Sequence, residues 1–224
     1  MLEAKDVTKS FRSGDGTVTA VKDVTMTVAN GEFVAIVGRS GSGKTTLMNL
    51  LGALEQPTSG MIFVDGQDIT RLSQGELVHY RGRKIGFVFQ SYNLVPNLTA
   101  TENVMLPMEF TGVGKAGRRK RARQLLEQVE LTGPRQGRKP GRLSGGEQQR
   151  VAIARALANK PSIILADEPA GNLDSQTSAT IVGLLRNLSR TEGTTVILVT
   201  HDASIAGQAD RVLRLEDGQL ALST

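Results

Sequence analysis

The sequence predicts an α/β fold built on a parallel sheet with helices on both faces. Short continuous apolar runs, typical of strands that are buried on both sides, occur at Phe33–Val37, Ile85–Phe89, Ser162–Ala166 and Thr195–Thr200. Helical patterns occur at Lys44–Leu54, Gln74–Arg83, Lys120–Leu131, Glu147–Ala158 and Gln176–Arg190. Strands that alternate with helices in this way favour parallel pairing with helical connections.

The composition restricts the class of protein. The chain has 224 residues, of which 39% are hydrophobic and 22% charged, and this suits one domain with a sizeable core or a core with an inserted subdomain. The lack of cysteine excludes disulfides and thiolate metal sites, and two histidines exclude a histidine-rich metal cage. The apolar runs are much shorter than the roughly 18–20 residues that span a bilayer. Because the amino terminus also lacks an apolar signal core, we expect a soluble intracellular protein.

The sequence also predicts strands near both ends of the chain, outside the alternation of strands and helices. Residues 2–8 and 17–28 alternate apolar and polar side chains on either side of the turn-prone segment Ser13–Gly16, so we expect an antiparallel β subdomain there. Residues 211–216 and 219–222 flank an Asp-Gly pair, which predicts a closing hairpin.

The middle of the chain predicts a helical insertion. Helical signals dominate between residues 91 and 159, where Thr99 and Glu102 have the spacing of a capping box. We therefore expect residues 1–224 to form a single domain, in which a helical subdomain at 91–159 interrupts a core made of 1–90 and 160–224.

The strongest motif follows the strand at Phe33–Val37 and opens a helix. Residues 38–45 read Gly-Arg-Ser-Gly-Ser-Gly-Lys-Thr and match the pattern G-x-x-x-x-G-K-[ST]. Glycines let such a loop wrap closely, so that its N–H groups and the helix start face phosphate oxygens. Lys44 would place its charge on the β- and γ-phosphates, and the Thr45 hydroxyl can bind Mg²⁺. Chance is the alternative explanation, but the position between strand and helix favours a phosphate-binding loop.

Two carboxylates follow the apolar run that ends at Ala166. Asp167 can bind Mg²⁺ directly or through water, and Glu168 can lie beside an attacking water. Since a residue before proline is pushed out of helical geometry, we expect Pro169 to keep Glu168 extended at the strand tip. A solvated turn would explain these residues if they stood alone, whereas the phosphate loop favours the catalytic interpretation.

A second glycine-rich helix start lies at Ser144-Gly-Gly-Glu147. Ser144 and Glu147 form a capping box pattern, but two glycines in a first turn cost up to about 1 kcal/mol each relative to alanine. Something must therefore approach this backbone closely, and an anion suits an exposed helix start. Because the chain already has a phosphate loop, we expect this site to face the nucleotide of another copy, in a head-to-tail dimer with ATP at the interface.

Gln90 and His201 also follow predicted strands. Either residue alone is better explained by a structural role. However, the phosphate loop, Gln90, the pair Asp167 and Glu168, and His201 all come directly after predicted parallel strands. Open α/β sheets bind ligands at this carboxyl edge, so the shared position favours roles at one phosphate site.

Together these motifs resemble the ATP-binding subunit of ABC transporters, over nearly the whole chain. In chain order the matching segments are the Walker A loop (38–45), the Gln loop (Gln90), the LSGGE signature (143–147), Walker B (163–168), the D-loop (172–174) and the switch His201. The resemblance implies a P-loop NTPase (RecA-like) parallel-sheet core with an N-terminal antiparallel β subdomain and an inserted helical subdomain.

The resemblance further implies a homodimer that holds two ATP molecules, each between the Walker A loop of one subunit and the signature of the other. It implies catalytic roles for Lys44, Gln90, Glu168 as general base, and His201 as a contact of the γ-phosphate. The implied Mg²⁺ ligands are Thr45, Gln90 and Asp167. The implied ATP-binding residues are Phe11, which stacks on adenine, and Gly38, Arg39, Ser40, Gly41, Ser42, Gly43, Lys44, Thr45, Thr46, Ser144, Gly145, Gly146, Glu147 and Asp174.

The segments around the Walker A loop, the Gln loop and Walker B resemble a narrower class of cassettes. This class serves macrolide exporters, lipoprotein release and FtsE-type cell division. Cassettes of the bacitracin-resistance type are also similar. Ala170 departs from the family, which usually has threonine or serine at this position. Since it lies beside the catalytic pair without belonging to it, we expect activity to survive.

The net charge of +5 is compatible with more than one kind of binding partner. The basic run Arg118–Arg123 is either a solvated helix face or a contact for acidic lipid headgroups or a permease loop. Some DNA-repair ATPases share this cassette, but they usually carry coiled-coil or zinc-bearing insertions. With aromatic residues at 4%, the chain also offers little surface for base stacking, so we expect no nucleic-acid partner.

The expected function is ATP hydrolysis coupled to a separate integral membrane permease subunit, with the protein peripheral on the cytoplasmic face of the cell membrane. Closure of the dimer would act on the permease through a groove near Gln90 and residues 91–106. Export, lipoprotein release and force transmission remain alternatives, as does a non-transport ABC ATPase that acts on DNA or in cell division.

Overall fold

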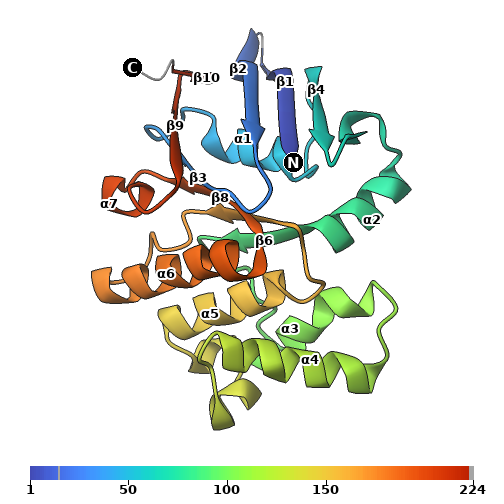
Figure 1. Cartoon of the computed structure of the whole chain (residues 1–224), viewed down its shortest axis with the longest axis vertical. Coiled ribbons are helices and arrows are strands. Elements are labelled where there is room, and N and C mark those ends of the chain that lie inside the picture. Colours follow the sequence, from blue (N-terminus) through green and yellow to red (C-terminus); the bar gives the residue numbers. More distant parts are fainter. Residues whose placement is uncertain (15, 222–224) are drawn as a thin grey trace.

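The computed structural model describes residues 1–14 and 16–221, and it contains a parallel sheet that lies below a smaller antiparallel sheet (Figure 1). The larger sheet has the strand order β10-β9-β3-β8-β7-β6. Its strands are β3 (Phe33–Val37), β6 (Ile85–Phe89), β7 (Ile163–Asp167), β8 (Thr195–Thr200), β9 (Arg211–Glu216) and β10 (Gln219–Leu220). All neighbours pair in parallel except β9 and β10, which form the predicted hairpin. The predicted α/β fold with a parallel core is confirmed.

The smaller sheet is antiparallel and has the order β2-β1-β4-β5. Its strands are β1 (Leu2–Ser13), β2 (Gly16–Val28), β4 (Ser59–Val64) and β5 (Gln67–Asp68). The predicted pair β1 and β2 is confirmed, although β1 continues beyond residue 8. Strands β4 and β5 were not predicted. Strand β4 pairs in antiparallel orientation with β1, which is distant from it in the chain. The predicted turn includes Asp15 and the predicted last strand includes Leu222, and both residues lie outside the described part of the chain.

The helices match most of the predicted segments. They are α1 (Lys44–Leu51), α2 (Gln74–Lys84), α3 (Ala100–Glu109), α4 (Lys115–Gln128), α5 (Gly145–Ala156), α6 (Ser175–Glu192) and α7 (Ala203–Ala206). The capping boxes predicted at Thr99 and Ser144 are both formed and begin α3 and α5. Helix α1 ends earlier than expected, at Leu51, with Gly52 as its C-cap. Helix α4 begins earlier than expected, at Lys115, because its first residues are mostly exposed and Ala116 is the one apolar side chain before Lys120.

Helix α1 lies between the two sheets, and the other face of the parallel sheet is covered by α5 and α6 (Figure 1). Buried side chains of α1 such as Leu47 and Leu51 join those of both sheets in one core. A second core joins α3, α4 and α5 through residues such as Val104, Leu125 and Val151. The strands of both sheets lie outside residues 91–159. Across residues 1–14 and 16–221, no helix combines the length and the apolar character needed to cross a bilayer.

A buried asparagine holds the segment between β6 and α3. Asn103 is fully buried, and its Oδ1 accepts a hydrogen bond of 2.8 Å from the backbone N–H of Val95. Its Nδ2 lies 3.1 Å from the carbonyl oxygens of Val95, Leu98 and Thr99. One amide side chain therefore satisfies the backbone of the loop that leads away from Gln90.

We expect Asn103→Ala to lower the free energy of unfolding by about 3 kcal/mol, because partly buried backbone groups of the loop lose their side-chain partner and a buried amide is removed. Urea unfolding followed by circular dichroism measures the effect. Asn187→Ala, on the exposed face of α6, is the matched control and should change stability by no more than about 0.5 kcal/mol. Equal effects of the two substitutions would contradict the anchoring role of Asn103.

Candidate functional site

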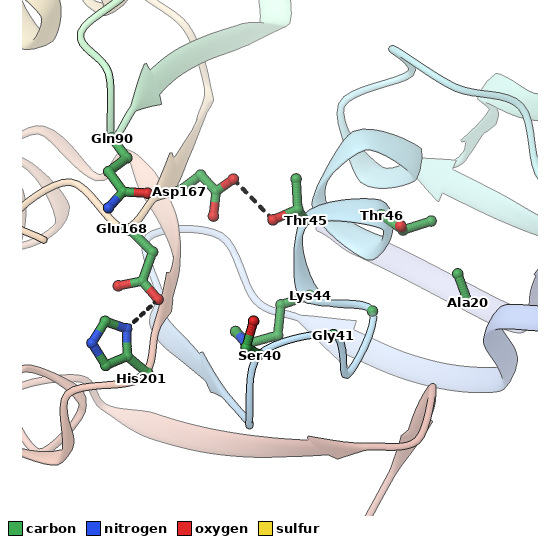
Figure 2. Close-up of a pocket in the computed structure, with 11 residues that line it drawn as sticks. Ala20, Ser40, Gly41, Lys44, Thr45, Thr46, Gln90, Asp167, Glu168 and His201 are labelled. Atoms are coloured by element: carbon green, nitrogen blue, oxygen red, sulfur yellow. Dashed lines mark hydrogen bonds and ion pairs between the residues drawn. The ribbon is translucent and has the colours of Figure 1, made fainter.

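The carboxyl edge of the parallel sheet surrounds a cavity of about 620 Å³ (Figure 2). It lies beyond the ends of β3, β6, β7 and β8, beside the start of α1. The residues that line it are Ala20, Ser40, Gly41, Gly43, Lys44, Thr45, Thr46, Gln90, Asp167, Glu168 and His201. The structure therefore brings the phosphate loop, both carboxylates, Gln90 and His201 together. Ala20 has no local sequence signal and was not predicted.

The start of α1 leaves backbone N–H groups free to bind an anion. Gly43 is the N-cap of α1, with a φ of 98°, and no side chain caps the helix. The N–H groups of Lys44, Thr45 and Thr46 have no carbonyl one turn earlier in the helix, which is the arrangement that phosphate groups bind. The Lys44 ammonium donates to the carbonyl oxygens of Gly38 and Arg39, each at 2.9 Å. It keeps one of its three N–H donors for a ligand.

Contacts with other strands explain why two positions of the phosphate loop are glycine. A Cβ atom on Gly38 would lie 2.2 Å from the carbonyl oxygen of Leu215, and one on Gly43 would lie 2.1 Å from that of Ala20. Close packing within the chain is therefore a reason for glycine at both positions, and their contact with phosphate stays a prediction. Gly41 is different: its φ is 79° and no atom lies within 4 Å of a Cβ placed there.

Asp167 and Thr45 form an oxygen-rich pair beside the loop. The Thr45 hydroxyl donates to Asp167 Oδ2 at 3.1 Å. Burial raises the pKa of Asp167 above its usual value and the charge of Glu168 adds to this, while the hydrogen bond from Thr45 opposes it. A hydroxyl and a carboxylate are ligands that suit Mg²⁺, which also uses phosphate oxygens and water. A cation at this position would compensate the buried carboxylate charge, so the residues fit the predicted ion.

Gln90 forms its hydrogen bonds with Asn172. Its Nε2 lies 3.4 Å from Asn172 Oδ1, and its carbonyl oxygen accepts a hydrogen bond of 3.3 Å from Asn172 Nδ2. This places the Gln90 amide against the D-loop at the cavity wall. Its role as a metal ligand stays a prediction.

Glu168 adopts an unexpected backbone conformation. Its φ is 45°, in the left-handed region, so the predicted extended conformation was wrong. Pro169 disfavours right-handed helical geometry but leaves the left-handed region open, and the N–H of Glu168 donates to Val199 on β8 at 2.9 Å. The carboxylate contacts His201 Nδ1 at 2.7 Å. As Figure 2 shows, Asp167 thus points toward Thr45 while Glu168 points toward His201.

The signature segment lies outside this cavity. Ser144 and Glu147 form a reciprocal cap, in which the backbone N–H of Ser144 lowers the pKa of Glu147. A Cβ on Gly145 would lie 2.9 Å from the Tyr92 hydroxyl, and one on Gly146 would lie 2.6 Å from Thr177 Cγ2. Side chains of the same chain therefore approach these glycines closely. Contact of Ser144–Glu147 with nucleotide stays a prediction.

The other predicted ligand residues are dispersed. Phe11 does not line the cavity, and the Lys9 ammonium lies 5.1 Å from the centre of its ring. Asp174 caps α6 by accepting from the N–H of Thr177 at 2.9 Å. Arg39 and Ser42 line a neighbouring hollow of about 330 Å³. The nucleotide contacts of these residues stay predictions.

Comparison with known proteins identifies close relatives. A family model described as ABC transporter matches residues 21–171. The macrolide export ATP-binding/permease protein MacB of Syntrophobacter fumaroxidans is 49% identical over 220 residues, which cover 97% of this chain and 31% of that protein. The uncharacterized ABC transporter ATP-binding protein MJ0796 of Methanocaldococcus jannaschii is 48% identical over 223 residues, which cover 98% of this chain and 95% of that protein. The chain therefore spans about a third of the length of the MacB relative.

Solved structures agree with the sequence comparison. A dimeric structure of MJ0796 in a post-hydrolysis state, bound to ADP and Pi, superimposes with a TM-score of 0.93 at 46% identity. The match covers 99% of this chain and 97% of that one. A second dimeric structure of the MJ0796 cassette also gives a TM-score of 0.93.

We expect Gly146→Ala to destabilise the protein by about 1–3 kcal/mol, because the new methyl group would overlap Thr177 Cγ2. Thr177→Ser removes that methyl group and keeps the hydroxyl that bonds to Asp174. The double variant should therefore recover most of the lost stability in urea unfolding. If Thr177→Ser gave no recovery, the packing explanation of Gly146 would be wrong.

Proposed function

The chain belongs to the ABC transporter family, as an ATP-binding cassette, and we propose that it hydrolyses ATP to drive a separate integral membrane permease subunit. One observation supports this most strongly. The uncapped start of α1, the Thr45–Asp167 pair and the Glu168–His201 pair all face one cavity (Figure 2). Phosphate binding, cation binding and water activation are thereby combined within reach of one triphosphate.

In the proposed reaction, Lys44 and the loop amides bind the β- and γ-phosphates. Thr45 and Asp167 would hold Mg²⁺, which supplies positive charge to the phosphate oxygens. Glu168 accepts a proton from the water that attacks the γ-phosphorus, while the bond to the bridging oxygen of ADP breaks. The 2.7 Å contact with His201 orients the Glu168 carboxylate and leaves the other ring nitrogen of His201 to face the γ-phosphate.

The position of the signature supports a homodimer in the ATP-bound state. Ser144 is exposed and does not line the cavity of its own chain. A second copy could therefore present this helix start to the nucleotide, as the sequence predicts. The MJ0796 cassette has been solved as a dimer with ADP and Pi bound, which is consistent with such an arrangement in this chain.

An apolar hollow supports a permease contact. It has a volume of about 450 Å³ and lies between α2, β6 and α3, next to the segment 91–106 that the sequence indicated. At its rim the Phe110 side chain is 82% exposed and Val78 is 60% exposed. Exposed apolar surface of this kind is typical of a protein interface. In this proposal a segment of the permease occupies the hollow, and the cassette lies on the cytoplasmic face of the membrane.

We expect Glu168→Gln to reduce ATP turnover by about 10²–10⁴-fold, because the amide cannot accept the proton from water. The Mg-ATP-bound dimer should then persist long enough to be seen by gel filtration. Glu127→Gln, at an exposed position of α4, is the matched control and should hydrolyse ATP like the unmodified protein. Normal turnover of Glu168→Gln, with no dimer, would contradict the assignment.

We expect Phe110→Ser to leave the ATPase rate of the isolated cassette unchanged and to weaken binding to the permease at least tenfold, because the complex loses an exposed aromatic side chain that the permease would cover. Co-purification with a candidate permease subunit measures the binding. Met61→Ser removes an exposed apolar side chain from β4, away from the hollow, and should bind normally. Similar binding of both variants would exclude the hollow as the contact.

A further inference from the structure

A buried threonine lies between the two catalytic elements of the site. Thr200 is the last residue of β8 and is only 1% exposed. Its hydroxyl lies 3.3 Å from Glu168 Oε2 and 3.1 Å from the backbone N–H of Asp202. No motif identified in the sequence includes this side chain.

The surrounding hydrogen bonds determine what the Thr200 hydroxyl can do. An N–H group can only donate, so Thr200 Oγ1 accepts from Asp202. A carboxylate can only accept, so the single hydroxyl proton is directed at Glu168. At 3.3 Å this hydrogen bond is long, as catalytic hydrogen bonds often are before substrate closes the site.

Three consecutive residues hold Glu168 against β8. The carbonyl oxygen of Val199 accepts from its backbone N–H, Thr200 contacts Oε2 and His201 contacts Oε1. His201 alone offers a poor support, because its side chain is 69% exposed whereas that of Glu168 is 15% exposed. A buried β-branched side chain at the end of a central strand has far less freedom than an exposed imidazole.

We propose that Thr200 is a positioning residue for Glu168, whose buried hydroxyl fixes the carboxylate in the orientation that activates water. The inference rests on the proposed ATPase function. Thr200 does not touch the substrate in this proposal, so its loss slows the chemical step and leaves ATP binding unchanged.

Two substitutions at position 200 test this role. Thr200→Val keeps the shape and removes the hydroxyl, and we expect kcat to fall about tenfold with KM for Mg-ATP unchanged within about twofold. Thr200→Ser restores a hydroxyl and should restore kcat to within about twofold of the unmodified protein. Thr200→Cys, which has a weak S–H donor, should lie between them and provides a second variant if valine prevents folding.

Thr195 provides a matched control on the same strand. It is the first residue of β8, is 3% exposed, and its hydroxyl accepts from Gly31 and donates to the carbonyl of Ala29. Thr195→Val therefore removes a buried threonine hydroxyl with similar partners far from Glu168. It should lower thermal stability about as much as Thr200→Val while leaving kcat unchanged.

Two further measurements do not depend on the turnover rate. In Mg-ATP, Thr200→Val should retain the dimer longer than the unmodified protein in gel filtration, and Thr200→Ser should not. In a crystal structure without nucleotide, the Glu168 carboxylate of Thr200→Val should leave the position that it occupies beside β8.

The outcomes separate the inference from the proposed function. If the unmodified protein does not hydrolyse ATP, the proposed function fails and the inference fails with it. If the unmodified protein is active and Thr200→Val has the same kcat, only the inference is overturned. A loss in Thr200→Val that serine does not rescue, or that Thr195→Val shares, also overturns it.

Discussion

The close packing of other backbone segments against the phosphate loop is the constraint on which the rest of the site depends. Gly38 lies against Leu215 of β9, and Gly43 lies against Ala20 of β2, at distances that leave no room for a Cβ atom. The loop thus lies where the parallel sheet, the antiparallel sheet and the C-terminal hairpin meet. Since each contact involves rigid backbone, a shift of either sheet would move the start of α1 and Lys44 with it.

A second set of contacts connects the helical segment to the same site. The Arg155 guanidinium of α5 donates to the carbonyl oxygens of Tyr92 and Asn93, in the loop that follows Gln90. The Tyr92 hydroxyl in turn packs against Gly145, at the start of α5. Arg155 also lines the apolar hollow between α2 and α3. An occupant of that hollow would therefore contact the helix that begins with the signature, and the loop that carries Gln90.

The two adjacent carboxylates differ because their surroundings differ. Asp167 ends β7, is bonded to Thr45, and has a pKa that burial raises. Glu168 turns away through its left-handed backbone conformation and contacts His201. The Asp167 carboxylate therefore suits cation binding, whereas the adjacent Glu168 carboxylate suits proton transfer. Different surroundings commonly give neighbouring carboxylates different roles.

The sequence by itself determined the type and order of the core elements, and which residues follow each strand. Periodicity predicted β3, β6 and β8 with their observed bounds, because strands buried on both faces need continuous apolar runs. Strand β4, the conformation of Glu168 and the neighbours of Gly146 were decided only by the tertiary structure. They depend on β1, β8 and α6, which are distant in the chain, and local patterns contain no information about such contacts. Gly145 and Gly146 show the division most clearly: the sequence required a close neighbour, and the fold determined which one.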